Sequence, residues 1–337
     1  MVKVPDSDNT TANAIIAWHE QKRERHRLHL GASLIGHDCD RYIWLTWRWA
    51  MTPEIEGRIR RLFDTGSREE LRILEELKTV GVELYQEADG QIQCRDETGH
   101  FGGSVDGVGK GFPEAPKTWA VLECKTMNDR TFKAVVDKGV KAEKPQHYAQ
   151  MQTYMGLLKL DRALYICVNK NTDHLHSEWV HFDDAAFAKY MGRAERLMKM
   201  RQTPLKISND PTHFICKMCS QYDLCHKGKI AEVNCRTCCH SIPLDNGTWG
   251  CDYKGIVISE EIQRVGCEAH LFIHDLVGAA KAIDGGVNST EYVEPSGKTF
   301  KNQNGNSRKI AKRKVISPQE AKSSEEFYRP FNDDIPF

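Results

Sequence analysis

The chain has 337 residues, of which 40% are hydrophobic and 28% are charged, and its 47 basic residues balance 47 acidic ones, for a net charge of zero. A chain of this length folds into about two domains with buried cores. Zero net charge excludes a nucleic-acid-binding surface that covers the whole molecule, so any such surface must be local. No apolar run approaches the ~20 residues of a membrane span, and the first residues lack the apolar segment of a signal peptide. We therefore expect a cytoplasmic protein that does not bind membranes.

Periodic hydrophobicity predicts a mixed α/β domain over residues 1–228. Helical spacing of apolar residues predicts helices, and alternation of apolar and polar residues predicts strands. The predicted helices cover residues 53–80, 128–139, 145–158 and about 184–201. The predicted strands cover residues 82–86 and 91–95 as a hairpin, then the segments 101–106, 118–125, 162–169 and 177–182. This order of elements indicates a central mixed sheet flanked by helices.

Three polar residues lie at the ends of two of these strands. Asp106 follows a run of small and apolar residues, and Glu123 and Lys125 flank Cys124 at the end of the next run. Side chains i and i+2 of a strand point to the same face, so Glu123 and Lys125 share a face. If both runs belong to one sheet, Asp106 joins them there. Two hard carboxylates beside a lysine are typical of a hydrolytic site for a divalent metal.

Further motifs surround these three residues. The full set is Gly66-Ser67-Arg68-Glu69-Glu70, Ser104-Val105-Asp106-Gly107, Leu122-Glu123-Cys124-Lys125 and Gln150-Met151-Gln152-Thr153-Tyr154. With these motifs the chain resembles the PD-(D/E)xK nuclease superfamily over about residues 30–228, and within it the RecB and lambda-exonuclease branches. The resemblance implies a restriction-endonuclease-like core and DNA cleavage that depends on Mg²⁺ or Mn²⁺.

The resemblance also implies a role for each matching residue. The metal ligands would be Glu70, Asp106, Glu123 and the backbone carbonyl of Cys124. Glu69 is the alternative to Glu70. Lys125 would orient or deprotonate the attacking water and offset phosphate charge, because a neighbouring cation lowers the pKa of a lysine toward the working range. Gln150 and Tyr154 lie one helical turn apart and would position the scissile phosphate or Lys125.

Twelve cysteines in a cytoplasmic protein indicate metal binding rather than disulfides. Cys216, Cys219 and Cys225 have the spacing C-x2-C-x5-C, and the distant Cys39 is available as a fourth ligand. This arrangement resembles the iron–sulfur nucleases of the AddB type and the CRISPR-associated adaptation nucleases. The resemblance implies a [4Fe–4S] cluster that staples the two ends of the domain. Zinc on the same four thiolates is the alternative.

A second cysteine-rich segment, residues 229–279, predicts a small zinc-binding module. Its candidate ligands are Cys235, Cys238, Cys251 and Cys267, which together offer four thiolates to one tetrahedral ion. Cys239, His240 and His270 are potential substitutes. Because the segment is short and poor in aliphatic residues, we expect it to need the metal in order to fold.

Residues 280–337 predict a disordered basic linker with an acidic tip. Seven lysines or arginines and no acidic residue fall between residues 295 and 319, a composition that disfavours a packed core and suits contact with DNA backbone. The chain ends in Asp333-Asp334-Ile335-Pro336-Phe337, which resembles the C-terminal tip of bacterial single-stranded-DNA-binding proteins (SSBs). The resemblance implies docking onto host repair or replication proteins, with the last side chain in an apolar pocket and the acidic groups on basic residues.

Together these features predict a metal-dependent DNA exonuclease of recombination or repair, encoded by a phage or prophage. A structure-specific or single-strand endonuclease of the same fold is one alternative. A non-catalytic DNA-binding decoy that intercepts SSB-interacting host proteins is another. The presence of Asp106, Glu123 and Lys125 argues against the decoy, which has no need of all three.

Overall fold

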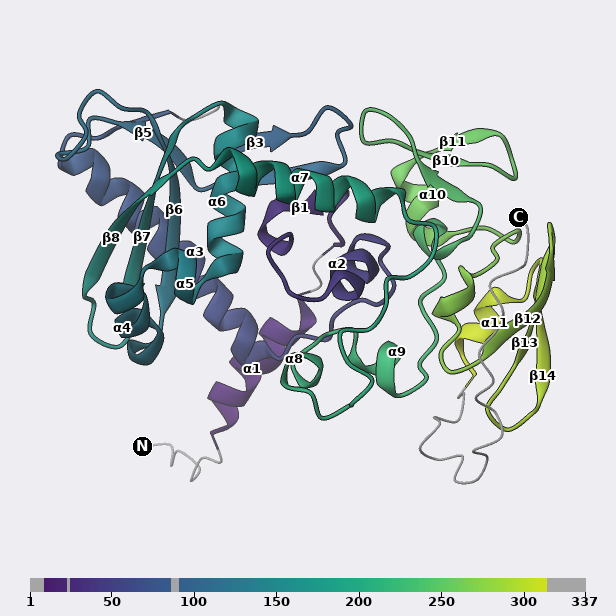
Figure 1. The fold of residues 1–337 in the computed structure, drawn as a ribbon. Helices are drawn as coiled ribbons and strands as arrows, with labels where there is room; N and C mark the ends of the chain where they lie inside the picture. Colours follow the sequence, from purple (N-terminus) through teal and green to yellow (C-terminus); the bar gives the residue numbers. More distant parts are fainter. Residues whose placement is uncertain (1–8, 23–24, 86–90, 314–337) are drawn as a thin grey trace. The chain divides into compact units, whose positions relative to one another are not determined.

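The computed structural model describes residues 9–22, 25–85 and 91–313. The chain forms two compact units, each assembled from separate stretches of sequence (Figure 1). Among the described residues, the first unit comprises residues 9–22, 25–38, 54–85, 91–198 and 245–247, and the second comprises residues 39–53, 199–244 and 248–313. The short stretch that carries Cys39 therefore belongs to the same unit as the cysteine-rich segments.

The first unit is built on a five-stranded mixed sheet. In spatial order its strands are β2 (Glu83–Tyr85), β5 (Gly107–Lys110), β6 (Ala120–Met127), β7 (Arg162–Asn169) and β8 (Leu175–His181). Neighbouring strands are antiparallel except for β6 and β7, which are parallel and place Glu123 opposite Tyr165. The connection from β6 to β7 contains α4 (Asp129–Lys138), α5 (Val140–Glu143) and α6 (Pro145–Leu158). The predicted mixed α/β class is thus confirmed.

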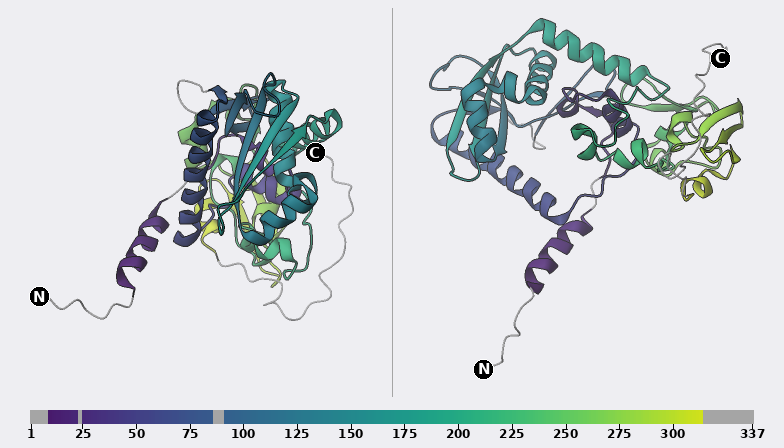
Figure 2. Two further views of the ribbon diagram at one scale, coloured as in Figure 1. Left: turned by 90° about the vertical axis from the view of Figure 1, so that its left-hand side faces the viewer. Right: turned by 60° about the horizontal axis from the view of Figure 1, so that its bottom comes forward.

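Helices cover both faces of this sheet (Figure 2). The long helix α3 (Gly57–Thr79) packs on one face, where Ile73 and Leu74 join Leu122 and Cys124 of β6 in a buried apolar cluster. Because side chains alternate along a strand, Glu123 points to the opposite face, on which α6 lies. Helix α1 (Thr10–Gln21) packs against α3, and α7 (Asp184–Lys199) follows β8.

A smaller sheet lies beside the first and determines where Asp106 is placed. Its strand order is β1 (Leu30–Gly31), β4 (Phe101–Val105) and β3 (Ile92–Arg95). The predicted hairpin of residues 82–86 with 91–95 is wrong, because β2 pairs with β5 whereas β3 pairs with β4. Asp106 occupies the bend between β4 and β5, where the chain leaves the small sheet and enters the large one.

The second unit consists of short elements around a stack of tryptophans and arginines. Its elements up to residue 276 are α2 (Asp40–Trp47), α8 (Phe214–Lys217), α9 (Tyr222–His226), η2 (Cys235–Thr237), β9 (Ser241–Pro243), β10 (Trp249–Cys251), β11 (Ile256–Ile258), α10 (Glu260–Val265) and η3 (His274–Leu276). The guanidinium of Arg236 lies 3.8 Å from the centroid of the Trp49 ring and 4.5 Å from that of Trp249. Arg48 lies 5.0 Å from the Trp249 ring, and all four side chains are buried. Cation–π contacts of this kind stabilise guanidinium groups that have left water.

Part of the predicted linker is folded. Strands β12 (Lys281–Gly286), β13 (Ser289–Val293) and β14 (Thr299–Gln303) form an antiparallel sheet, and α11 (Ser307–Ala311) follows it. The expectation of disorder from residue 280 is therefore wrong for this stretch: Tyr292 and Phe300 stack with ring centroids 5.4 Å apart and supply a small core. No helix among the described residues is long and apolar enough to cross a membrane.

Candidate active site

Asp106, Glu123 and Lys125 meet where the two sheets diverge. Asp106 Oδ2 accepts a hydrogen bond from the backbone amide of Cys124 across 2.8 Å. Lys125 Nζ forms an ion pair with Glu123 and lies 3.8 Å from Asp106 Oδ2. The lysine also donates to the Cys124 carbonyl across 3.2 Å, so the carbonyl expected to bind metal faces the same group. The structure thus brings together the three residues that the strand pattern singled out.

Glu123 is the most buried member of this group, with a relative exposure of 0%. Apart from the ion pair with Lys125, neither of its carboxylate oxygens has a hydrogen-bond partner among the described residues. Burial raises the pKa of Glu123 to about 8, an effect that Lys125 opposes and Asp106 adds to. Burial lowers the pKa of Lys125, but Glu123 and Asp106 outweigh it and raise that pKa above its usual range. Buried carboxylate oxygens with so few partners fit a site for a hard divalent cation.

Helix α3 adds one of two adjacent glutamates to the group. Glu70 Oε1 accepts a hydrogen bond from Gln91 Nε2 across 2.8 Å. Burial raises the pKa of Glu70, and the nearby charge of Asp106 raises it further. Glu69 instead forms an ion pair with Arg72 across 3.0 Å. The structure therefore directs Glu70 toward the acidic group and Glu69 toward another residue of its own helix.

Helix α6 presents Gln150 and Tyr154 from the opposite side. Both side chains are buried, and Gln150 Nε2 donates to Tyr154 Oη across 3.4 Å. Burial raises the pKa of Tyr154, and Glu123 raises it further, so the phenol stays protonated near neutral pH. Tyr154 packs directly over Gly103 of β4, where an added Cβ would lie 2.4 Å from Tyr154 Oη. A side chain at position 103 would therefore have to displace the Tyr154 ring.

The sequence patterns missed His147, which lies on the same face of α6. His147 Nδ1 lies 2.9 Å from the hydroxyl of Tyr165, the residue paired with Glu123 across the sheet. Burial and the charge of Lys125 lower the pKa of His147 to about 3, so its ring is neutral. Residues 147, 150 and 154 have the i, i+3, i+7 spacing of one helix face. That spacing could have connected His147 with Gln150 and Tyr154.

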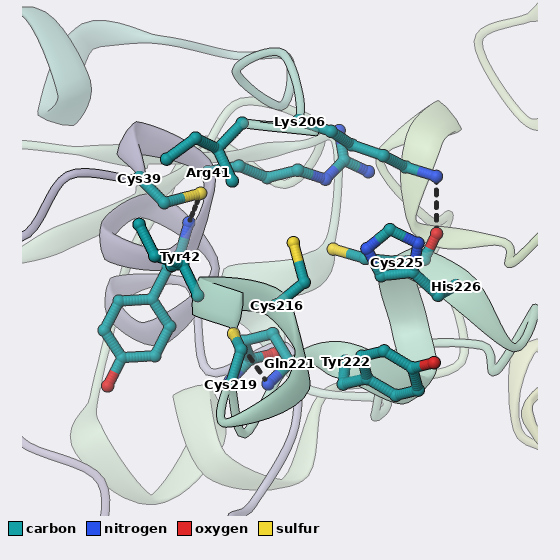
Figure 3. A pocket seen from close by; sticks show the side chains of 12 residues that line it. Cys39, Arg41, Tyr42, Lys206, Cys216, Cys219, Gln221, Tyr222, Cys225 and His226 are labelled. Atoms are coloured by element: carbon teal, nitrogen blue, oxygen red, sulfur yellow. Dashed lines mark hydrogen bonds between the residues drawn. The ribbon is translucent and has the colours of Figure 1, made fainter. Parts of the chain in front are cut away.

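The four cysteines of the first cluster line one pocket of the second unit (Figure 3). Cys39 Sγ accepts from the amide of Tyr42 at the start of α2, and Cys219 Sγ accepts from the amide of Gln221, both across 3.4 Å. Burial raises the pKa of Cys219 to about 11. Cys216 and Cys225 point into the same space from α8 and α9.

The sulfurs of the first cluster are less closely grouped than the potential ligand atoms of Cys238, Cys239 and His240. Within the part of the chain that the structure describes, Cys238, Cys239 and His240 are the one group of three potential ligand atoms that lie within 4.8 Å of one another. No three sulfurs of the first cluster meet that limit among the described residues. A tetrahedral zinc site, with Zn–S distances of about 2.3 Å, holds its sulfurs roughly 3.8 Å apart. The set of Cys235, Cys238, Cys251 and Cys267 does not meet the limit either, so this limit does not select between a cluster and a single ion.

The four predicted zinc ligands also line one pocket, together with His240 and His270. Only Cys238 belongs to the close group as well, beside Cys239 and His240. A hydrogen bond from the Cys239 thiol lowers the pKa of Cys238, which favours the thiolate that a metal binds. His270 Nε2 lies 3.2 Å from Thr237 Oγ1, and burial lowers the pKa of this histidine to about 3. The tip formed by residues 333–337 lies outside the described residues.

Fold and site thus define a mixed α/β protein with a buried acidic centre beside a lysine.

No family model matches the chain, and no curated protein matches it. Among solved structures, an alkaline exonuclease from Laribacter hongkongensis is 16% identical with a TM-score of 0.38 over 55% of this chain and 90% of its own. Its complex with dAMP gives a TM-score of 0.37 at the same identity and coverage. A phage-related exonuclease from Haemophilus somnus 129PT is 17% identical with a TM-score of 0.30, over 39% of this chain and 66% of its own. Likenesses this low do not establish a family, so a functional conclusion must rest on the site.

Proposed function

We propose that this protein is a metal-dependent nuclease that hydrolyses DNA phosphodiester bonds. The observation that carries the proposal is the meeting of Asp106, Glu123 and Lys125 around a fully buried carboxylate. A structural ion pair alone is a weak explanation for this group, because burying a carboxylate costs several kcal/mol and the pair brings little net stability. Perturbed carboxylates grouped around a lysine are a pattern of functional sites.

The proposed cation ligands are oxygen atoms, as Mg²⁺ and Mn²⁺ prefer. They are the side chains of Glu70, Asp106 and Glu123 and the carbonyl of Cys124. When bound, the cation offsets phosphate charge and supplies an activated water. Lys125 holds a positive charge next to the carboxylates and orients the attacking water or the phosphate. Gln150 and Tyr154 donate hydrogen bonds that position the scissile phosphate or Lys125, consistent with a phenol that stays protonated.

Two further cofactors complete the proposal. A [4Fe–4S] cluster on Cys39, Cys216, Cys219 and Cys225 is supported by the pocket that these four cysteines share and by the C-x2-C-x5-C spacing of the last three. It would serve as a structural staple, since hydrolysis needs no electron transfer. A zinc ion at the second cluster is supported by the close group around Cys238 and by the pocket that Cys235, Cys251 and Cys267 line with it.

In its finer form the proposal is an exonuclease of phage or prophage origin that acts in recombination or repair. The C-terminal tip would recruit host proteins that read SSB, or compete with SSB for them. Deleting residues 335–337 should remove binding to such proteins in a pull-down. Binding that survives the deletion would refute the docking.

The activity itself is tested on linear and circular DNA with Mg²⁺. We expect the wild type to degrade linear DNA, chelation to stop the reaction, and Asp106→Ala and Lys125→Ala to be inactive while folded. Cleavage of closed circles would indicate the endonuclease alternative. Full activity in both variants would refute this site, and DNA binding without cleavage in the wild type would favour the decoy.

A further inference from the structure

Two cationic side chains converge on one corner of the four-cysteine pocket. Arg41 comes from α2, two residues after Cys39, and Lys206 comes from the segment between α7 and α8. Figure 3 shows both side chains extending across the pocket toward Cys225. Burial raises the pKa of Cys225, the positive charge of Arg41 opposes that rise, and the Lys206 ammonium donates to the Cys225 carbonyl.

The structure holds these cations in place with neutral partners. Arg41 Nη1 donates to Thr203 Oγ1 across 2.7 Å and to the carbonyl of Pro204 across 3.0 Å. No aspartate or glutamate lines the pocket, and no carboxylate of the described residues forms an ion pair with either cation. Elsewhere in this unit, cations such as Lys227 and Arg264 do pair with acidic residues of their own helices. The cysteines are therefore the groups of this pocket that, as thiolates, would carry negative charge beside Arg41 and Lys206.

Charge balance explains why a thiolate site needs such neighbours. Four cysteine thiolates carry four negative charges, and a metal core of charge +2 leaves two of these unbalanced. The remaining wall of the pocket is largely apolar, with Ile207 and Ile215 among its residues, so water screens this excess poorly. A guanidinium and an ammonium beside Cys225 offset it.

We propose that Arg41 and Lys206 are positioning residues of the four-thiolate centre, which stabilise its negative charge and so slow metal loss and raise the reduction potential of a bound cluster. The inference rests on the proposed cofactor at Cys39, Cys216, Cys219 and Cys225. Hydrogen bonds to sulfur and nearby charge are the factors by which a protein sets cluster potentials. Loss of residues that support metal ligands typically weakens metal binding about 10- to 100-fold.

The test uses the full-length protein purified without oxygen. Iron, sulfide and zinc are measured for each variant, followed by the rate of metal release to a chelator and, for a cluster, a potentiometric titration monitored by electron paramagnetic resonance. We expect Arg41→Gln and Lys206→Gln to release metal about tenfold faster and to lower the potential. Arg41→Lys should recover part of the loss. Lys217→Gln is the matched control, because Lys217 is exposed and adjacent to Cys216 but does not line the pocket.

The outcomes separate this inference from the proposals on which it rests. Wild-type release rates and potential in both glutamine variants would overturn the role of the cations while leaving the cofactor in place. A wild type without iron or zinc at these cysteines would overturn the cofactor and the inference together. The proposed nuclease activity is tested separately, with the Asp106→Ala and Lys125→Ala variants. If Arg41→Gln fails to fold, Lys206→Gln and Arg41→Lys still decide the question.

Discussion

The carboxylate of Asp106 accepts a hydrogen bond from the backbone amide of Cys124, which joins the bend between β4 and β5 to the strand that carries Glu123 and Lys125. The Asp106 side chain thus stabilises the junction of the two sheets and is also a member of the candidate site. The amide fixes one carboxylate oxygen, and the same oxygen lies 3.8 Å from Lys125 Nζ. Asp106 is consequently held in place beside Lys125 without any bound cation.

The two roles of Asp106 can be separated by two substitutions. Asp106→Asn keeps an oxygen that can accept from Cys124 but removes the charge, so we expect an inactive protein of nearly wild-type stability. Asp106→Ala removes the acceptor too and should cost a further roughly 1–3 kcal/mol in the free energy of unfolding. Urea denaturation and a Mg²⁺-dependent nuclease assay measure the two effects. Substantial activity in Asp106→Asn would contradict the ligand role.

Adjacent glutamates on α3 provide a matched pair of variants. Glu70→Gln should lower nuclease activity at least about tenfold, because it removes a charge from the acidic group. Glu69→Gln should stay within about twofold, because it breaks only an ion pair with the exposed side chain of Arg72, and pairs with exposed partners contribute little. Activities at saturating and limiting Mg²⁺ show whether the loss is one of metal affinity. The reverse order of effects would assign the ligand to Glu69.

Close packing of α6 on β4 can be tested at Gly103. Gly103→Ala would place a Cβ 2.4 Å from Tyr154 Oη, so we expect a destabilisation of about 1–3 kcal/mol and displacement of the tyrosine. Tyr154→Phe removes that hydroxyl and with it the steric conflict. The double variant should therefore lose less free energy of unfolding than the sum of the losses in the two single variants. Thermal denaturation of all four proteins gives the coupling free energy. Additive losses would show that the two side chains do not meet as described.

His147 makes the free energy of unfolding depend on pH. Its folded-state pKa of about 3 lies below the ordinary value of 6.5, so the unfolded chain takes up a proton first as the pH falls. The contribution of His147 to the free energy of unfolding is therefore fully present above pH 6.5 and is lost as the pH falls toward 3. Between pH 7 and pH 5 the loss is roughly 2 kcal/mol. We expect His147→Gln to reduce the difference in stability between pH 7 and pH 5 by about that amount. Parallel pH profiles for wild type and variant would contradict a neutral buried ring.

The second cysteine cluster makes a prediction about zinc content. Cys238→Ser should remove the zinc and destabilise the second unit, because Cys238 belongs both to the close group and to the shared pocket. Cys239→Ser should retain the metal but weaken its binding, because the Cys239 thiol donates to Cys238. Zinc measured by native mass spectrometry, with fluorescence of the buried Trp249 as a folding signal, distinguishes the two. Equal loss of zinc from the Cys238→Ser and Cys239→Ser variants would indicate that Cys239 is itself a ligand.

Short-range regularities in the chain determined much of this picture. Glu123 and Lys125 share a face because a strand alternates its side chains, and Gln150 and Tyr154 share one because a helix repeats every 3.6 residues. These rules depend only on neighbours along the chain, so they hold whatever the rest of the molecule does. The same is true of cysteine spacing, which indicates Cys216, Cys219 and Cys225 and the second cluster as candidate metal ligands.

Tertiary structure alone decided which segments pair and which way a helix faces. Adjacent residues of a helix point about 100° apart, so the choice between Glu69 and Glu70 follows from the packing of Ile73 and Leu74 against the sheet. Strand β3 pairs with β4 rather than β2, which leaves Asp106 at the junction of two sheets. Pairing partners and helix rotation are set by long-range burial of apolar surface, and local composition carries no record of them. Short motifs of the sequence therefore indicate which residue types the candidate site contains, whereas the arrangement of those residues depends on the fold.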